Sequence, residues 1–167
     1  MKYPLWAIAG PLLIAGFVWL SGFLLPRKHE AGASLKMRAS PEAVWAVLTA
    51  VENYPDWRSD LAVSEVIDSA PALTWKESDA RGRTMVHAAG LGRIAEKWVD
   101  QTVRGDLRQS GERVFLIVPD AEGGSRVAVT ERVELRDPWA RFRARFVTGY
   151  AAPLKKLLED LRKRLAE

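Results

Sequence analysis

The sequence predicts an α+β domain that follows an apolar N-terminal segment. Three observations support this prediction. A short strand at residues 33–39 leads into two short helices. Strand-like alternation then recurs between residues 61 and 135, and an amphipathic helical pattern closes the chain from Pro138. Because a sheet must cover its apolar face, and the terminal helix is the only element long enough to do so, we expect the sheet to pack against that helix.

The N-terminal segment predicts a transmembrane anchor. Residues 5–25 contain no charged residue, and Ser21 is the only polar one. A helix of this length spans about 30 Å, the thickness of the hydrocarbon core of a bilayer. We therefore expect residues 1–32 to form an uncleaved anchor with a short linker and residues 33–167 to form the domain. A cleaved signal peptide is the alternative, but its nearest small-residue site, Ala31-Gly32-Ala33, lies beyond a charged stretch.

Charge and composition predict location and exclude several classes of function. Basic residues gather after the apolar run, which by the positive-inside bias predicts a single-pass protein with its C-terminal domain in the cytoplasm. The chain has no cysteine, so a disulfide framework and thiolate chemistry are excluded. The net charge of +4 comes from a mixed surface without a basic stripe interleaved with aromatic residues, so we expect no nucleic-acid partner. The oligomeric state is left open.

Residues 40–57 predict a helix pair. Ser40 is a good N-cap, Pro41 suits the first helical position, and Glu42 places a negative charge in the first turn. Apolar residues follow at helical spacing and face a core: Val44, Val47, Leu48 and Val51. Pro55 is expected to end the run.

The remaining elements follow from periodicity. Alternation predicts strands near residues 61–67, 73–77, 83–89, 94–103, 113–118 and 127–135. Together with the strand at 33–39, they make a sheet of about seven strands. Asp137 and Pro138 are expected to start one long terminal helix, with a bend where Pro153 removes a backbone hydrogen bond.

The sequence resembles the SRPBCC, or START-like, superfamily, in its polyketide cyclase/dehydrase and lipid-transport branch. The resemblance covers residues 33–166. It rests on these motifs: Ser40-Pro41-Glu42-Ala43-Val44-Trp45, Asn53-Tyr54-Pro55-Asp56-Trp57, Trp75-Lys76-Glu77, Arg81-Gly82, Gly123-Gly124-Ser125-Arg126-Val127, Thr130-Glu131, Asp137-Pro138, Arg141-Phe142 and Arg145-Phe146-Val147-Thr148-Gly149. The motifs from Trp75 onward resemble one membrane-anchored bacterial subgroup, which implies a location in the bacterial inner membrane.

The resemblance implies a helix-grip fold, in which a curved antiparallel sheet wraps around the long C-terminal helix and leaves a pocket between them. The sequence departs from the subgroup between Ala88 and Gly111, a segment that would help to line the mouth of the pocket. The superfamily includes lipid carriers, receptors and cyclases, so the resemblance specifies the fold more strongly than the function.

Two glutamates are the candidate chemical groups. Glu77 shares a strand face with Trp75, and Glu131 shares one with four apolar residues of its own strand, so both are expected to project into a mostly apolar cavity. A buried carboxylate must be paired or protonated, and Arg113 and His87 are candidate partners by the same parity. The alternatives are a buried ion pair, glutamates at strand ends that reach water, an anchor for a ligand head group and an acid/base pair.

We therefore predict a membrane-anchored domain that binds a lipid or another hydrophobic small molecule. A cyclase/dehydrase-type enzyme using Glu77 or Glu131, and a ligand-free structural module, are the alternatives. With only His29 and His87 and no cofactor fingerprint, we expect neither a metal nor a resident cofactor. The residues expected to line the cavity are Trp75, Glu77, Met85, His87, Trp98, Arg113, Phe115, Glu131, Phe142 and Phe146.

Overall fold

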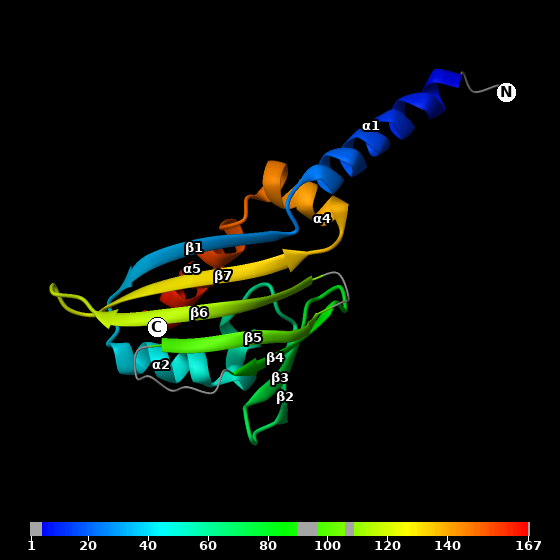
Figure 1. Cartoon of the computed structure of the whole chain (residues 1–167). Coiled ribbons are helices and arrows are strands. Elements are labelled where there is room, and N and C mark those ends of the chain that lie inside the picture. The colour runs from blue at the N-terminus through cyan, green and yellow to red at the C-terminus, as the bar shows by residue number, and fades with distance from the viewer. Residues whose placement is uncertain (1–4, 90–96, 106–108, 167) are drawn as a thin grey trace.

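A seven-stranded antiparallel sheet forms the centre of the molecule in this computed structural model, which describes residues 5–89, 97–105 and 109–166 (Figure 1). The sheet order is β1-β7-β6-β5-β4-β3-β2, so the prediction of an antiparallel sheet of seven strands is confirmed. The strands are β1 (Lys28–Met37), β2 (Val63–Asp68), β3 (Thr74–Ser78), β4 (Thr84–Ala89), β5 (Lys97–Gly105), β6 (Gln109–Pro119) and β7 (Ser125–Leu135). The helices are α1 (Leu5–Leu24), α2 (Pro41–Thr49), η1 (Val51–Asn53), α3 (Tyr54–Trp57), α4 (Pro138–Arg143), η2 (Ala144–Thr148) and α5 (Ala152–Arg164).

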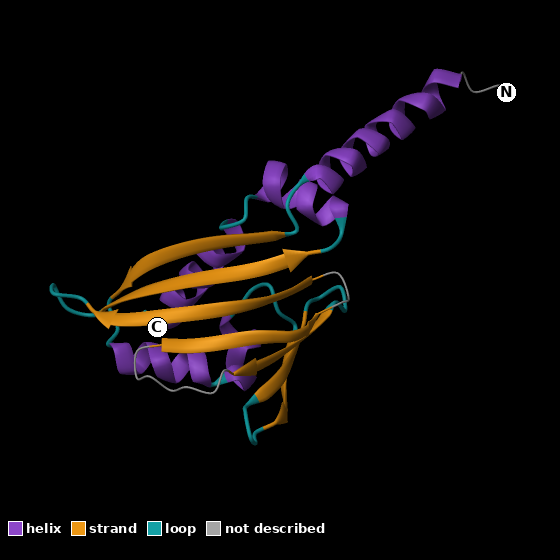
Figure 2. Cartoon of the chain, in the orientation of Figure 1, coloured by secondary structure: helices purple, strands orange, loops and turns teal. Residues whose placement is uncertain are grey.

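The sheet curves, and helices α2 and α5 lie against the same face of it (Figure 2). The core between these layers is apolar and almost free of solvent. It includes Val44 and Leu48 of α2, Val127 and Val129 of β7, and Leu154, Leu158 and Leu161 of α5. Each such side chain contributes about 1.5–3 kcal/mol when fully buried. The α+β architecture predicted from the pattern of elements is therefore confirmed, including burial of the sheet by the terminal helix.

The helix pair at residues 40–57 forms largely as its capping residues predict. The Ser40 hydroxyl accepts a hydrogen bond from the Ala43 N–H at 3.3 Å, and this N-cap starts α2. The place of Pro55 was predicted wrongly. Helix α2 already ends at Thr49, and Pro55 lies in the first turn of α3, where a missing N–H costs no helical hydrogen bond.

The C-terminal part of the chain is two helices rather than the one long helix predicted. Helix α4 is capped by Asp137, as expected, and continues into the π-helical turn η2. The chain then breaks at Gly149, whose φ of +76° is accessible to glycine at little cost. Pro153 does not bend a helix, because it lies in the first turn of α5. The apolar spacing continues across this break, so the pattern alone predicted one element.

The N-terminal predictions need two corrections. Strand β1 begins at Lys28 and pairs with β7, so most of the predicted linker before residue 33 belongs to the sheet. The helix predicted from residue 5 is present as α1, but the predicted membrane span is not supported. Within residues 5–89, 97–105 and 109–166, no helix combines the length and the apolar character needed to cross a bilayer.

The end of α1 packs directly on α4. A side chain at Gly22 would collide with the Pro138 carbonyl, so only glycine allows this close approach. The buried guanidinium of Arg141 donates hydrogen bonds to the carbonyls of Phe23, at 3.3 Å, and Leu25, at 2.7 Å. Arg141 therefore satisfies backbone acceptors at the end of α1 that have no partner within the helix.

Candidate functional site

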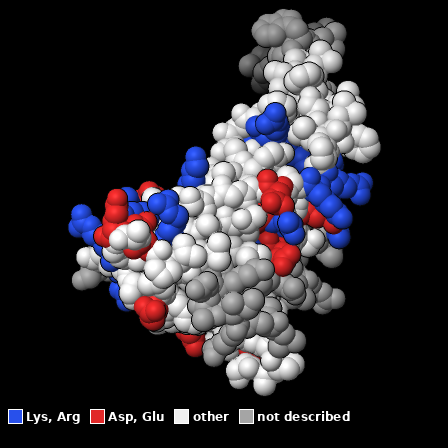
Figure 3. All heavy atoms as spheres, turned by 60° about the vertical axis from the view of Figure 1, so that its left-hand side comes forward, with Lys and Arg blue, Asp and Glu red and all other residues white. Residues whose placement is uncertain are grey.

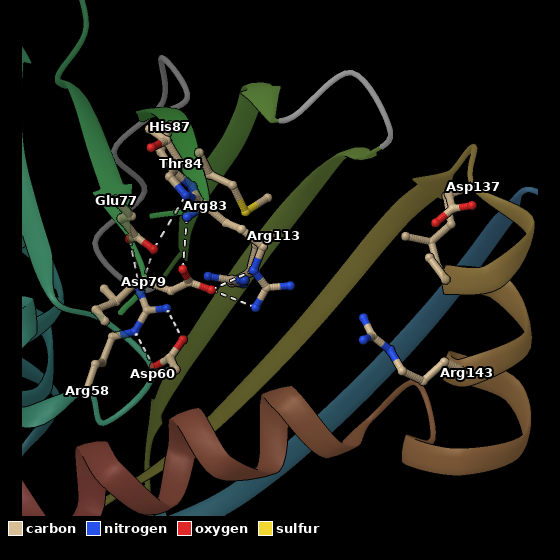
Figure 4. Close-up of a pocket in the computed structure, with 14 residues that line it drawn as sticks. Arg58, Asp60, Glu77, Asp79, Arg83, Thr84, His87, Arg113, Asp137 and Arg143 are labelled. Atoms are coloured by element: carbon tan, nitrogen blue, oxygen red, sulfur yellow. Dashed lines mark hydrogen bonds and ion pairs between the residues drawn. The ribbon is translucent and has the colours of Figure 1, made fainter. Parts of the chain in front are cut away.

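A cavity of about 500 Å³ lies between the sheet and α4, with the loop after α3 at its opposite end (Figure 4). Its volume is within the range of small-molecule sites. The described residues that line it include more charged groups than expected. The charged lining residues are Arg58, Asp60, Glu77, Asp79, Arg83, Arg113, Asp137 and Arg143, and the others are Leu61, Thr84, Met85, His87, Leu135 and Ala140. The lining thus combines apolar surface, as predicted, with many charged side chains that the strand parity did not predict.

Glu77 is enclosed by donors at one end of this cavity. Its side chain is 5% exposed, and Arg58 Nη1 donates to both carboxylate oxygens at 2.9 and 3.0 Å. Trp75 Nε1 donates to Oε1 at 3.0 Å, and His87 Nε2 lies 3.5 Å from Oε2. The inward orientation predicted for Glu77 and the proximity of His87 are confirmed. Of the alternatives raised for Glu77, the geometry matches the buried ion pair.

Arg58, the principal partner of Glu77, is held by several elements. Its guanidinium also contacts Asp60, with Nε–Oδ1 at 3.3 Å and Nη2–Oδ2 at 2.8 Å, and lies 5.3 Å from the centre of the Tyr54 ring. The next residue, Ser59, donates to the Asp160 carboxylate of α5 from its backbone N–H at 3.2 Å and its hydroxyl at 2.7 Å. The loop that carries Arg58 is thus fixed between α3, β3 and α5.

Arg58 and Asp60 stabilise each other in their charged forms. Burial acts to lower the pKa of Arg58, but the charge of Glu77 and the contact with Asp60 raise it above its ordinary value. Burial likewise acts to raise the pKa of Asp60, but the hydrogen bond and charge of Arg58 outweigh it and lower the pKa. Arg58 therefore stays protonated and Asp60 stays deprotonated around neutral pH.

Glu131 occupies a different environment. It pairs with Arg113 across β6 and β7, with Nη2–Oε1 at 2.7 Å, as the shared parity predicted. Its carboxylate does not line the large cavity. It lines a smaller hollow of about 170 Å³ beside Tyr150 and Pro153. The two glutamates therefore do not converge on one space, although both have an arginine partner.

The other predicted lining residues divide into three groups. Met85, His87 and Arg113 line the cavity with Glu77. Trp75 and Phe115 belong to the core, because their rings fill the space under the sheet; Trp75 also stacks on His87 with ring centres 5.2 Å apart. Phe142 lies in a hollow beside Val18 and Trp139, and Phe146 is 60% exposed. Neither lines the cavity, because the predicted single terminal helix breaks after them. The side chain of Trp98 lies outside the described residues.

The polar groups of the cavity that lie in loops or at helix ends were not predicted from the sequence. Arg58 and Asp60 follow the aromatic corner at Tyr54 and Trp57, where no periodicity indicates which way a side chain points. Arg143 lies where α4 passes into the π-helical turn η2, a change of helix type that the apolar pattern does not indicate. The one available signal was position, since Arg58 directly follows the corner. In the described ranges, no cluster of three or more His, Asp or Glu side chains is placed to hold a metal ion.

A family model described as "Polyketide cyclase / dehydrase and lipid transport" matches residues 29–166. The chain belongs to this family. The match begins at the second residue of β1 and includes all strands and the helices from α2 onward, so it covers the sheet and both ends of the cavity. The resemblance stated from the sequence is confirmed at this level, while the membrane-anchored subgroup stays a prediction. No curated protein matches the chain.

Solved structures show the same fold. A START superfamily protein from Mycobacterium smegmatis is 20% identical, with a TM-score of 0.65, over 83% of this chain and 97% of that chain. The Zhui aromatase/cyclase from a Streptomyces species is 10% identical, with a TM-score of 0.73, over 83% and 94%. Norcoclaurine synthase from Thalictrum flavum is 14% identical, with a TM-score of 0.66, over 90% and 91%. At these identities the likeness establishes the helix-grip, START-like fold.

Proposed function

We propose that this chain binds a hydrophobic small molecule in the cavity between the sheet and α4. The observation that supports this most directly is the cavity of about 500 Å³ itself, which side chains leave open next to a fully packed core. Leu61, Met85, Leu135 and Ala140 provide apolar surface in its wall, and the charged groups lie around them. Sites of this kind use apolar surface for affinity and a few polar groups for orientation.

The family and its structural neighbours support an organic ligand. The family description includes lipid transport, one neighbour is named an aromatase/cyclase, and a structure of norcoclaurine synthase is in complex with dopamine and hydroxybenzaldehyde. These names cover both aliphatic and aromatic molecules. We therefore propose a class of ligand with an apolar chain or ring system, and the choice between chain and ring is left to the binding experiment.

A cyclase or dehydratase reaction with Glu77 or Glu131 as general base is the weaker candidate. Arg58 and Trp75 occupy the oxygens of Glu77, and Arg113 binds Glu131. A carboxylate that accepts charge-assisted hydrogen bonds must give them up before it can take a proton from a substrate. The ligand-free module is also weaker, because it requires a collapsed cavity.

Native mass spectrometry of the delipidated full chain tests the binding function. The chain is incubated with fatty acids, isoprenoids, phospholipids and small aromatic compounds, and we expect a 1:1 complex with at least one class. Ala140→Trp, which fills the cavity wall, should weaken that complex at least about tenfold, since it displaces apolar contact area. Ala121→Trp, on the exposed turn before β7, is the matched control. No complex with any class, or equal binding by Ala140→Trp, would refute the function.

Location at a membrane is a separate proposal. It is supported by α1, which projects from the domain (Figure 1) and exposes apolar side chains such as Leu13, Phe17 and Leu24. The described part of this helix contains no charged residue, and Figure 3 shows it as a white projection. Basic residues Arg27 and Lys28 follow the helix directly, as at a surface with anionic lipids. Fractionation of cells expressing the full chain and a chain lacking residues 1–25 tests this. Equal partition of both chains would contradict it.

A further inference from the structure

Three of the four arginines that line the cavity have a carboxylate partner. Arg58 pairs with Glu77 and Asp60, Arg83 pairs with Asp79 at 2.6 Å, and Arg113 pairs with Glu131 at 2.7 Å. The fourth, Arg143, is exposed at the end of α4, and among the described residues its guanidinium makes no hydrogen bond or ion pair. Arg143 is therefore the cavity arginine whose donors are available to a bound molecule.

The orientation of Arg143 suits this role. Its guanidinium extends from α4 toward the sheet, across the cavity from the cluster of Arg58, Asp60 and Glu77 (Figure 4). Asp137 lines the same end, but one of its carboxylate oxygens accepts the Trp139 N–H at 3.3 Å as the N-cap of α4. No ion pair joins Asp137 to Arg143 in the described structure. A ligand can thus reach the guanidinium without first breaking an internal pair.

The charge balance limits the chemical class of the ligand. A guanidinium presents a planar fork of donors that fits carboxylates and phosphates in a bidentate manner. Four arginines and four carboxylates line the cavity, and one of these carboxylates, Asp137, lies at the same end as Arg143. A phosphate dianion would therefore meet more repulsion there than a carboxylate with a single negative charge. The apolar wall formed by Leu61, Met85, Leu135 and Ala140 lies within the same cavity. This arrangement favours a molecule with one carboxylate and an apolar body.

We infer that the ligand of this cavity is an apolar carboxylic acid whose carboxylate binds Arg143. The inference rests on the proposed function and adds the chemistry of the head group. Arg143 is in this view a binding residue that selects for charge, while the Arg58–Glu77 cluster shapes the other end of the cavity and does not contact the head group.

Calorimetric titration of the full chain with two matched pairs of probes tests the inference. The pairs are decanoate with 1-decanol, and 2-naphthoate with 2-naphthol. We expect the acid of at least one pair to bind about ten- to a hundredfold tighter than its neutral partner, the range for a hydrogen bond to a charged group. Arg143→Gln should abolish this preference, and Arg143→Lys should retain part of it. Arg145→Gln, an exposed arginine of η2 that does not line the cavity, should keep the preference in full.

The outcomes separate this inference from the proposed function. If the neutral probes bind as tightly as the acids, or if Arg143→Gln keeps the preference, the inference is wrong and the binding function stands. If decyl phosphate binds tighter than decanoate, the assignment to a carboxylate is wrong. If no probe binds to the full chain, the proposed function fails together with the inference. Thermal melting of each variant confirms that it is folded before titration.

Discussion

The two ends of the cavity each carry an arginine, and these two arginines differ in burial and in carboxylate partners. At one end the Arg58 side chain is 6% exposed and has two carboxylate partners, Glu77 and Asp60. At the other end Arg143 is exposed and has no carboxylate partner in the described structure. A charge removed from water must be paired, whereas a charge that water reaches can stay unpaired. The buried cluster is therefore part of the fold, while the exposed arginine is available to bind a ligand.

The largest effect is expected at the buried end. Arg58→Met leaves Glu77 buried without its main partner, so the free energy of unfolding should fall by about 3–5 kcal/mol in chemical denaturation. Replacing both residues, Arg58→Met with Glu77→Met, should recover part of that loss, because no buried charge is left over. Arg132→Met is the matched control: it breaks the pair of Arg132 with Glu30, whose side chains are 70% and 55% exposed, and should cost less than about 1 kcal/mol. Equal losses in the two single variants would contradict the comparison.

A smaller effect is expected where α5 holds the loop of Arg58. Asp160→Asn weakens the hydrogen bonds from Ser59 and Lys156, and should lower the free energy of unfolding by about 1–3 kcal/mol at pH 7. Burial acts to raise the pKa of Asp160, but the hydrogen bonds from Ser59 and the contact with Lys156 lower it overall. Its contribution is therefore present above the ordinary aspartate pKa, about 3.9, and is lost as the pH falls through the lower value of the folded state.

The difference in stability between the wild type and Asp160→Asn should accordingly shrink below about pH 4. Denaturation curves across this range measure it. Asp56→Asn, on the exposed face of α3, removes a carboxylate of the same kind that makes no ion pair with the described residues. It serves as the control, with little expected change in the free energy of unfolding. A constant difference across the range would show that the charge of Asp160 does not matter.

The break at Gly149 offers a third test, because it separates the helical segment that carries Arg143 from α5. Gly149→Ala should lower the free energy of unfolding by about 1–2 kcal/mol, since the backbone there has a positive φ that alanine disfavours. The added methyl group would lie in open space, so a steric clash does not contribute. Gly16→Ala, in α1 and also in open space, should cost nothing, because alanine favours a helix. A neutral Gly149→Ala would mean that the chain can continue as one helix.

The smallest effect on stability is expected at the exposed end of the cavity. Arg143→Gln should change the free energy of unfolding by less than about 0.5 kcal/mol, because an exposed side chain without a partner contributes little to the fold. Thermal melting in the absence of ligand measures this. A loss comparable to that of Arg58→Met would show that Arg143 has a structural partner, and the contrast between the two ends would disappear.

Local periodicity was sufficient to predict which faces of β3 and β7 point inward. In β7 the alternation of Val127, Val129, Val133 and Leu135 placed Glu131 on the inward face, and the parity of β3 did the same for Glu77. Capping residues likewise predicted where α2 and α4 begin. These features depend on residues within one element, so they can be read from neighbouring positions in the sequence.

The α+β class, the seven strands, the inward orientation of Glu77 and Glu131 and the family resemblance were all predictable from local sequence patterns. Packing between distant elements sets the other features. Glu77 pairs with Arg58, Arg143 has no carboxylate partner among the described residues, the terminal pattern forms two helices, and the glutamates lie in separate hollows. These features could not be predicted because the residues that make them are far apart in the sequence. Arg58 lies in a loop that Asp160 holds from about a hundred positions away, and no local pattern encodes such a contact.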